Sequence, residues 1–183
     1  MRARIRAMAD AANVNHNRVQ VIHAQFHPKY YEVPDGWKFK STPVFALLRE
    51  ISKVVVSNWY WIQSPRAHGE AYEHEEYKTL EGYASYGARR YVKYLNWLNE
   101  IKLEETYCNE DINTEEFVRT QLSRLLGIDY VPTQEVVDHI MEISAQRINL
   151  IGADHDNVPD SVIEVIRREA QACRFPVYRE RYL

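Results

Sequence analysis

The sequence of 183 residues contains little glycine, proline or cysteine: six, seven and two residues. Rossmann and P-loop folds depend on glycine-rich turns, and many-turned β folds also use glycine and proline. Neither a Gly-x-Gly-x-x-Gly nor a Gly-Lys-Ser/Thr motif occurs. The scarcity therefore favours helices and argues against a nucleotide-binding domain.

Cys108 and Cys173 form no Cys-x-x-Cys or zinc-type spacing and have no flanking nucleophile signature. Two reduced thiols are the first interpretation, and a single disulfide is the alternative. No serine lies in a Gly-x-Ser-x-Gly turn. We therefore predict no catalytic and no cofactor-binding residues.

The chain also lacks an excess of positive charge, with a net charge of −3 and a pI near 6.2. This balance argues against nucleic acid as the main partner. The pairs Arg89-Arg90 and Arg167-Arg168 could contact RNA, but salt bridges or protein contacts are the commoner explanation. No segment is apolar enough to span a membrane, since the best candidate, 44–62, is interrupted by charged residues.

The charge is unevenly distributed. Residues 1–31 hold five basic residues against Asp10 alone, a net charge of +4, which leaves −7 for the remainder. Residues 1–18 are rich in arginine and nearly free of acidic residues, with alanine spaced between the arginines, a composition typical of mitochondrial transit segments. A basic arm on a cytosolic protein is the alternative. With turn signals at 27–28 and 33–36, residues 1–41 are predicted to be an extended basic arm, and 42–183 a helical domain.

What the chain does contain is apolar residues, at 45%, and many amphipathic aromatics, with 13 tyrosines and 4 tryptophans. These aromatics suit either a core with a wet rim or an interface with partners. Apolar spacing predicts five helices. They are 42–64, 86–100, 114–126, 133–149 and 159–172. The first has Pro43 at its first helical position and Pro65 just after its end. The third has Asn113 and Glu116 as a capping box at its start and Gly127 just after its end.

The acidic segment 104–116 reads as a linker, and the tail 173–183 could dock on a partner or fold back. The helices of the second half are joined by short connections, which make neighbours antiparallel. Such units stack in α-hairpin solenoids, so residues 82–172 are predicted to form a helical-hairpin core in an all-α fold.

The densest group of metal-type ligands is His68, Glu70, Glu73, His74, Glu75 and Glu76. A di-iron bundle needs Glu-x-x-His elements, and Glu70 and His74 are four residues apart without apolar neighbours. A solvated charged face is the simpler interpretation. Asp154-His155-Asp156 lacks the glycine and final glutamate of an EF-hand loop and reads as a turn. No metal site is therefore predicted.

One stretch carries a family resemblance. Ala88–Asn96 has Ala-Arg followed by aromatics and asparagine, Leu122–Leu126 precedes Asp129-Tyr130-Val131-Pro132, and Val136-Val137-Asp138 is followed by Gln146-Arg147-Ile148-Asn149. In their order these segments resemble the cytochrome c oxidase subunit Va/VI family of mitochondria, and from Leu122 to Asn149 the spacing agrees without a gap. Some 80 residues precede the match, and 104–111 looks like an insertion.

The resemblance implies an all-α protein of antiparallel hairpins in a short right-handed superhelix. It implies a non-catalytic structural subunit of mitochondrial cytochrome c oxidase (respiratory complex IV), peripheral on the matrix side of the inner membrane. Such a subunit binds no haem or copper and contacts other subunits. One alternative is a helical-repeat scaffold subunit of another mitochondrial assembly, ATP synthase or the ribosome. An alternative of another class is a small helical metalloenzyme using His68 and His74.

Overall fold

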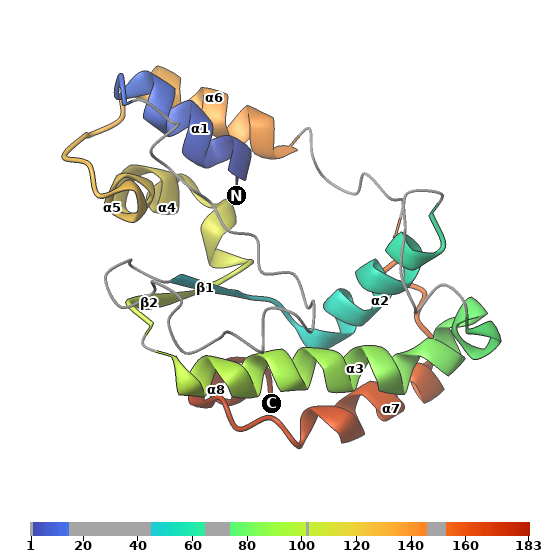
Figure 1. Cartoon of the computed structure of the whole chain (residues 1–183). Coiled ribbons are helices and arrows are strands. Elements are labelled where there is room, and N and C mark those ends of the chain that lie inside the picture. Colours follow the sequence, from blue (N-terminus) through green and yellow to red (C-terminus); the bar gives the residue numbers. More distant parts are fainter. Residues whose placement is uncertain (1, 15–44, 65–73, 102, 146–152) are drawn as a thin grey trace. The chain divides into compact units, whose positions relative to one another are not determined.

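The computed structural model describes residues 2–14, 45–64, 74–101, 103–145 and 153–183 (Figure 1). Within these ranges the protein is mostly helical, with one small sheet. The α-helices are α1 (Arg2–Ala11), α2 (Ile51–Ile62), α3 (Leu80–Trp97), α4 (Glu115–Thr120), α5 (Leu122–Leu126), α6 (Gln134–Ala145), α7 (Asp160–Ala170) and α8 (Pro176–Tyr182). The 3-10 helices are η5 (Glu75–Lys78), η6 (Leu98–Glu100) and η7 (Asp111–Asn113), and the strands are β1 (Phe45–Leu48) and β2 (Glu105–Cys108).

The chain divides into two compact units, each built from two separate stretches of sequence. The first unit comprises Met1–Ala24 and Cys108–Leu150, and the second comprises Gln25–Tyr107 and Ile151–Leu183. The boundary expected at residue 41 lies outside the described residues. None of the described helices has both the length and the apolar character needed to cross a bilayer.

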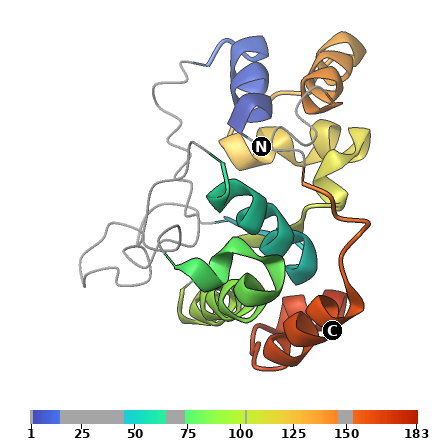
Figure 2. The same cartoon turned by 90° about the vertical axis from the view of Figure 1, so that its right-hand side faces the viewer.

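The second unit is organised around α3, which packs against α2 and α7 (Figure 2). Its buried residues follow steps of three and four, the spacing that places side chains on one helical face; they are Tyr83, Ala84, Gly87, Ala88, Tyr91, Val92 and Leu95. The helix begins six residues before the predicted start because Thr79 caps it, its hydroxyl accepting a hydrogen bond from the Gly82 amide at 3.1 Å. The long helix α3 is therefore the central packing element of the second unit.

Helix α8 belongs to the same core, which decides between the two interpretations of the tail. Tyr178 is fully buried, and its hydroxyl accepts a hydrogen bond from the Ile51 amide at 2.7 Å. Phe175 and Cys173 are buried beside it in the core. The tail therefore folds back on its own chain.

The mostly helical character agrees with the predicted fold class, and the structure adds a two-stranded sheet to it. Strand β1 pairs with β2, and the rings of Phe45 and Tyr107 stack 6.3 Å apart. The predicted helix 42–64 is therefore wrong at 45–48, because a short apolar run has no period that separates strand from helix. The predicted linker 104–116 is also wrong, since it contains β2, η7 and the start of α4.

The first unit contains α1, α4, α5 and α6, with α1 packed on α5 and α6. The predicted helix 114–126 is split at Gln121 into α4 and α5, and Thr114 rather than Asn113 caps α4, accepting from the Phe117 amide at 3.2 Å. Gly127 ends α5 in the left-handed conformation, with φ of 63°, as predicted. The Thr133 hydroxyl accepts a hydrogen bond from the Val136 amide at 3.4 Å, at the start of α6.

Helix α1 corrects the extended-arm prediction for residues 2–11. Alanine and arginine are strong helix formers, and this helix buries Met8 and Ala9 completely. Arg4 is only 6% exposed and donates hydrogen bonds to the Ile112 carbonyl and the Asn113 side chain. The segment expected to be a transit segment or a free arm thus supplies part of the core of the first unit.

Candidate interaction groove

Of the group that comes closest to metal chemistry in the sequence, His68, Glu70 and Glu73 lie outside the described residues. His74 is exposed beside Tyr77, with ring centres 5.1 Å apart, and Glu75 pairs with Lys78 at 2.6 Å. Within the described part of the chain, no group of three His, Cys, Asp or Glu side chains could hold a metal ion.

The Asp154 loop is the turn that the sequence predicts. One carboxylate oxygen of Asp154 accepts hydrogen bonds from the amides of Asp156 and Asn157, each at 3.1 Å, and the other accepts from the Asn157 side chain at 2.7 Å. These hydrogen bonds lower the pKa of Asp154. Its carboxylate is therefore occupied in shaping the turn that leads into α7.

A serine–histidine pair beside this turn was not expected from the sequence. The Ser57 hydroxyl of α2 lies 3.3 Å from Nε2 of His155 and accepts a hydrogen bond from Arg49 at 3.1 Å. Burial, and then the charges of Arg49 and Lys53, lower the pKa of His155. Within the described residues, Nδ1 of His155 is buried without a hydrogen-bond partner. Because a serine hydrolase needs an orienting group at that nitrogen, we assign this pair to packing.

Both cysteines are buried free thiols, as the first interpretation predicted. Burial raises the pKa of the Cys173 thiol. A buried thiol with a raised pKa forms little thiolate and is a poor nucleophile. Cys173 therefore serves as a small apolar residue of the core.

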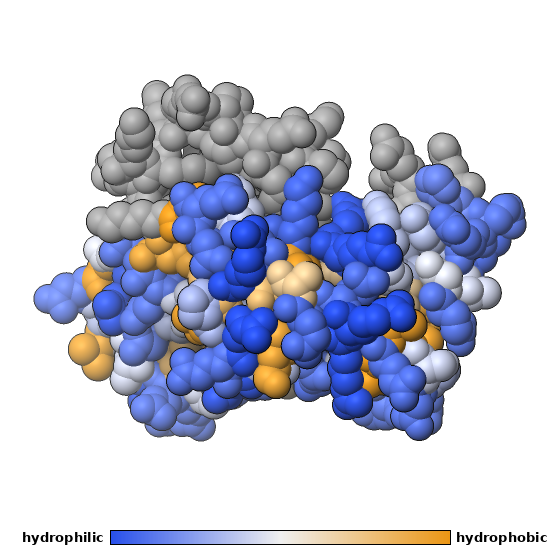
Figure 3. All heavy atoms as spheres, turned by 90° about the horizontal axis from the view of Figure 1, so that it is seen from below, coloured by the Kyte–Doolittle hydropathy of each residue, from blue (hydrophilic) through white to orange (hydrophobic). Residues whose placement is uncertain are grey.

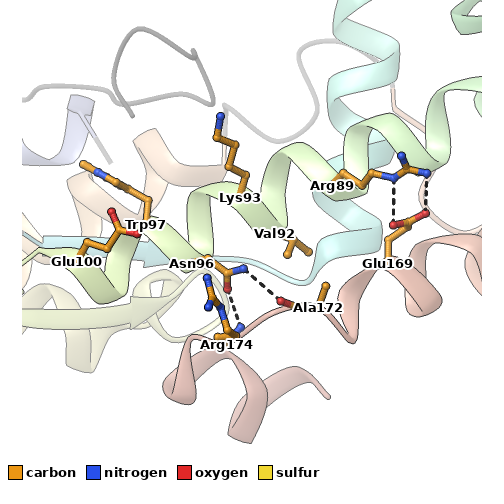
Figure 4. Close-up of a pocket in the computed structure, with 9 residues that line it drawn as sticks. All are labelled: Arg89, Val92, Lys93, Asn96, Trp97, Glu100, Glu169, Ala172 and Arg174. Atoms are coloured by element: carbon orange, nitrogen blue, oxygen red, sulfur yellow. Dashed lines mark hydrogen bonds and ion pairs between the residues drawn. The ribbon is translucent and has the colours of Figure 1, made fainter. Parts of the chain in front are cut away.

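The clearest candidate site is a groove between α3 and the turn that joins α7 to α8 (Figure 4). Its volume is about 350 Å³. The groove is lined by Arg89, Val92, Lys93, Asn96 and Trp97 of α3, Glu100 of η6, Glu169 of α7, and Ala172 and Arg174 of the turn. All of these elements belong to the second unit, so the groove is a feature of one compact body.

An ion pair fixes one end of the groove. Nε of Arg89 lies 3.1 Å from one carboxylate oxygen of Glu169, and the other oxygen accepts hydrogen bonds from Ser85 at 2.8 Å and from Arg89 at 3.2 Å. The Ser85 and Arg89 hydrogen bonds lower the pKa of Glu169. Two side chains of α3, Ser85 and Arg89, therefore stabilise the negative charge of Glu169.

Asn96 fixes the other end. Its side-chain amide donates to the Ala172 carbonyl at 3.1 Å, and its oxygen accepts from the Arg174 backbone amide at 2.6 Å. One side chain thus satisfies two backbone groups of the turn after α7, where helices leave carbonyls unpaired. The turn, including the backbone of Arg174, is therefore held against α3.

The groove is lined by charges of both signs. Arg89 pairs with Glu169, and Lys93, Arg174 and Glu100 also lie in the lining. Arg167 and Arg168, both exposed, lie nearby on the last turn of α7. The face of α3, α7 and α8 in Figure 3 is largely hydrophilic, with apolar residues only in small separate areas. Such a surface offers charged groups of both signs and limited apolar contact.

Only fragments of this groove were predictable from the sequence. The two arginine pairs were expected to form salt bridges or protein contacts rather than to contact RNA, and Arg89 does form an ion pair. Arg90 instead lies over the Tyr86 ring, 5.4 Å from its centre. Nothing in the sequence pointed to the role of Asn96, because its partners are the backbone groups of Ala172 and Arg174. These residues lie 76 and 78 positions later in the chain.

No protein-family model, curated protein or solved structure matches the chain.

Proposed function

We propose that the chain is a non-catalytic structural subunit of mitochondrial cytochrome c oxidase, bound peripherally on the matrix side of the inner membrane. Its role is to stabilise the complex through contacts with other subunits. The observation that carries the proposal is the ordered resemblance from Leu122 to Asn149 to the subunit Va/VI family. The Arg-rich, acid-poor start supports a mitochondrial location.

The local structure of the matched segment supports the proposal. Gly127 ends α5 in the left-handed conformation, and Ser123 donates a hydrogen bond to the Tyr130 carbonyl at 2.6 Å. This bond secures the connection to α6, in which Pro132 is buried while Val131 is 84% exposed. A short, fixed connection between two helices is the element from which antiparallel hairpins are built.

The finer architecture is part of the same proposal. A short right-handed superhelix of antiparallel hairpins would place successive helices of the core beside one another. In the second unit, α7 packs on α3, its neighbour in space but not in sequence. We therefore propose that α4, α5 and α6 form the antiparallel hairpin stack. Helices α3 and α7 would pack as a separate pair.

Co-migration tests the proposed function. Mitochondrial membranes from cells expressing an epitope-tagged chain would be solubilised in mild detergent and separated on a native gel. We expect the tag in the band that carries the haem a absorbance. Migration with ATP synthase or the mitochondrial ribosome would replace this proposal with the scaffold alternative, and migration as a free chain would reject both.

A further inference from the structure

We propose that His155 is part of a pH-sensitive latch, which holds the segment 153–159 against α2 while the histidine ring is neutral and releases it when the ring is protonated. The latch consists of Arg49, Ser57 and His155. The segment leads into α7 and lies just after the boundary at which the chain enters the second unit. This inference goes beyond the proposed function, because it assigns a conformational device to the fold of this chain.

The latch joins its three side chains by two polar contacts. A guanidinium nitrogen of Arg49 donates a hydrogen bond to the Ser57 hydroxyl of α2 at 3.1 Å, and this hydroxyl lies 3.3 Å from Nε2 of His155. Ala153 is buried and Val158 packs against the core, so apolar contacts lie on both sides of His155 in the segment. The Ser57 hydroxyl therefore fixes the middle of the segment to α2.

A neutral ring fits this contact. Ser57 accepts from Arg49 and can donate its own proton to Nε2 of His155, which places the ring proton on Nδ1. Within the described residues, Nδ1 is buried without a hydrogen-bond partner. A protonated ring carries an N–H at both nitrogens, so the hydroxyl would have to turn to accept from Nε2. The charged ring would also keep a buried N–H without an acceptor, which costs more than the same defect in a neutral ring.

The positive charges around the ring act in the same direction. Burial, and then the charges of Arg49 and Lys53, lower the pKa of His155. Lys53 is partly balanced by Glu50, which lies 3.4 Å away. The guanidinium of Arg49 is bonded to the same hydroxyl as the ring, and arginine stays charged at every physiological pH. Protonation of His155 therefore adds a positive charge beside a permanent one.

The carboxylates of the segment oppose this effect without reversing it. Asp156 and Asp154 favour the protonated ring, but both are exposed, and the pKa of His155 is lowered overall. Release of the segment returns His155 to its ordinary pKa of about 6.5, at which it binds a proton more readily. The stability that the latch contributes is therefore fully present above pH ~6.5 and is lost as pH falls through the lower pKa of the folded state.

Hydrogen exchange of the purified full chain tests the latch. Protection factors of the 153–159 amides would be measured by NMR from pH about 7.5 to about 5, the range in which histidine changes its charge. The amides of Asp156 and Asn157 are hydrogen-bonded to Asp154 in the folded segment and report its release. The pKa of Asp154 is lowered, so this carboxylate stays ionised throughout. We expect protection to fall by about tenfold over this range, while that of α3 stays constant.

Three substitutions separate His155 from other groups. His155→Gln keeps a side chain that can meet the Ser57 hydroxyl but cannot gain a proton, so protection of the segment should become independent of pH. His139→Gln is the matched control, because it makes the same substitution at an exposed histidine of α6, and it should leave the fall in place. Lys53→Met removes one repelling charge and should reduce the fall by about twofold, since that charge is partly screened by solvent.

The ring of His155 can also be followed directly, which keeps the test decisive if His155→Gln does not fold. In the unmodified chain its resonances should titrate below pH ~6.5, together with the fall in protection. Protection that does not depend on pH, an unchanged dependence in His155→Gln, or a ring that titrates at or above pH ~6.5 would overturn the inference. All of these measurements use the chain alone. Absence of the chain from cytochrome c oxidase would thus reject the proposed function and leave the latch in place.

Discussion

Tyr91 of α3 and Arg49, which precedes α2, exchange two hydrogen bonds. The Tyr91 hydroxyl donates to the Arg49 carbonyl at 2.9 Å and accepts from the Arg49 amide at 3.1 Å. Tyr91 is only 2% exposed, and its ring meets Tyr178 of α8 edge-on at 5.8 Å. One side chain therefore connects three elements of the second unit.

Tyr91→Phe should lower the free energy of unfolding of the second unit by about 1–3 kcal/mol, because it keeps the ring but leaves two backbone groups unpaired. Urea denaturation followed by tryptophan fluorescence measures the change. Tyr60→Phe is the control, since the Tyr60 hydroxyl makes no hydrogen bond within the described residues. Equal effects of the two substitutions would show that the Tyr91–Arg49 exchange contributes nothing.

Alkaline pH should weaken the second unit through Tyr83. Burial raises the pKa of Tyr83 to about 12, while an unfolded tyrosine has a pKa near 10. The folded state keeps the proton where the unfolded state has lost it. The stability from this group is therefore fully present below pH ~10 and lost as pH rises through ~12.

As pH rises from about 10 to about 12, ionisation of Tyr83 should lower the free energy of unfolding by roughly 2–3 kcal/mol. Tyr83→Phe has no proton to lose, so its unfolding free energy should fall less steeply between pH 9 and 12. Denaturant titrations at several pH values compare the two slopes. Parallel slopes would contradict the assignment. Tyr94, whose pKa burial also raises to about 12, contributes in the same direction.

Gly87→Ala should destabilise the second unit, although alanine is the better helix former. A Cβ at this position would lie 2.7 Å from the Tyr83 ring, which Tyr77 and Tyr86 hold from other sides. Such overpacking costs about 1–3 kcal/mol, more than the ~1 kcal/mol that alanine gains in a helix.

A double-mutant cycle separates the two terms. In a Tyr83→Leu background the clash is relieved, so Gly87→Ala should become neutral or stabilising in thermal denaturation. If Gly87→Ala destabilises the Tyr83→Leu protein as much as the parent protein, the Tyr83 ring is not the source of the clash.

The fold was predictable where local chemistry decides it. Gly127, expected to end a helix, ends α5 in the left-handed conformation, and apolar spacing predicted a helix over most of α3; both signals involve residues close in sequence. The Thr79 cap was missed, so the predicted start of α3 was six residues late. The pairing of β1 with β2 joins residues about sixty positions apart and has no local signal. The groove has the same difficulty, because Asn96 and Arg174 meet only after α3 and the α7–α8 turn have packed.

Helix α1 shows a further limit. Its arginine-rich, acid-poor composition predicted a targeting segment, and nothing in that composition distinguishes the buried Arg4 from the exposed Arg6. Only the tertiary hydrogen bonds of Arg4 to η7 make that difference.

That difference supplies a matched pair of variants. Arg4→Met should destabilise the first unit by about 2 kcal/mol, because the Ile112 carbonyl loses its donor, whereas Arg6→Met should change little. Hydrogen exchange of α4–α6 amides reports the first unit separately. Both substitutions remove one positive charge, so mitochondrial import should respond equally to each. Equal exchange protection in the two variants would contradict a core role for α1.

The most direct measurement of the central claim is the amount of this chain in cytochrome c oxidase purified through a tag on another subunit. Quantitative mass spectrometry against isotope-labelled peptides gives the molar ratio to the haem a–containing complex. The proposed function predicts a ratio near equimolar that survives washing. A chain that is absent, or present only in traces that vary with the preparation, would contradict it.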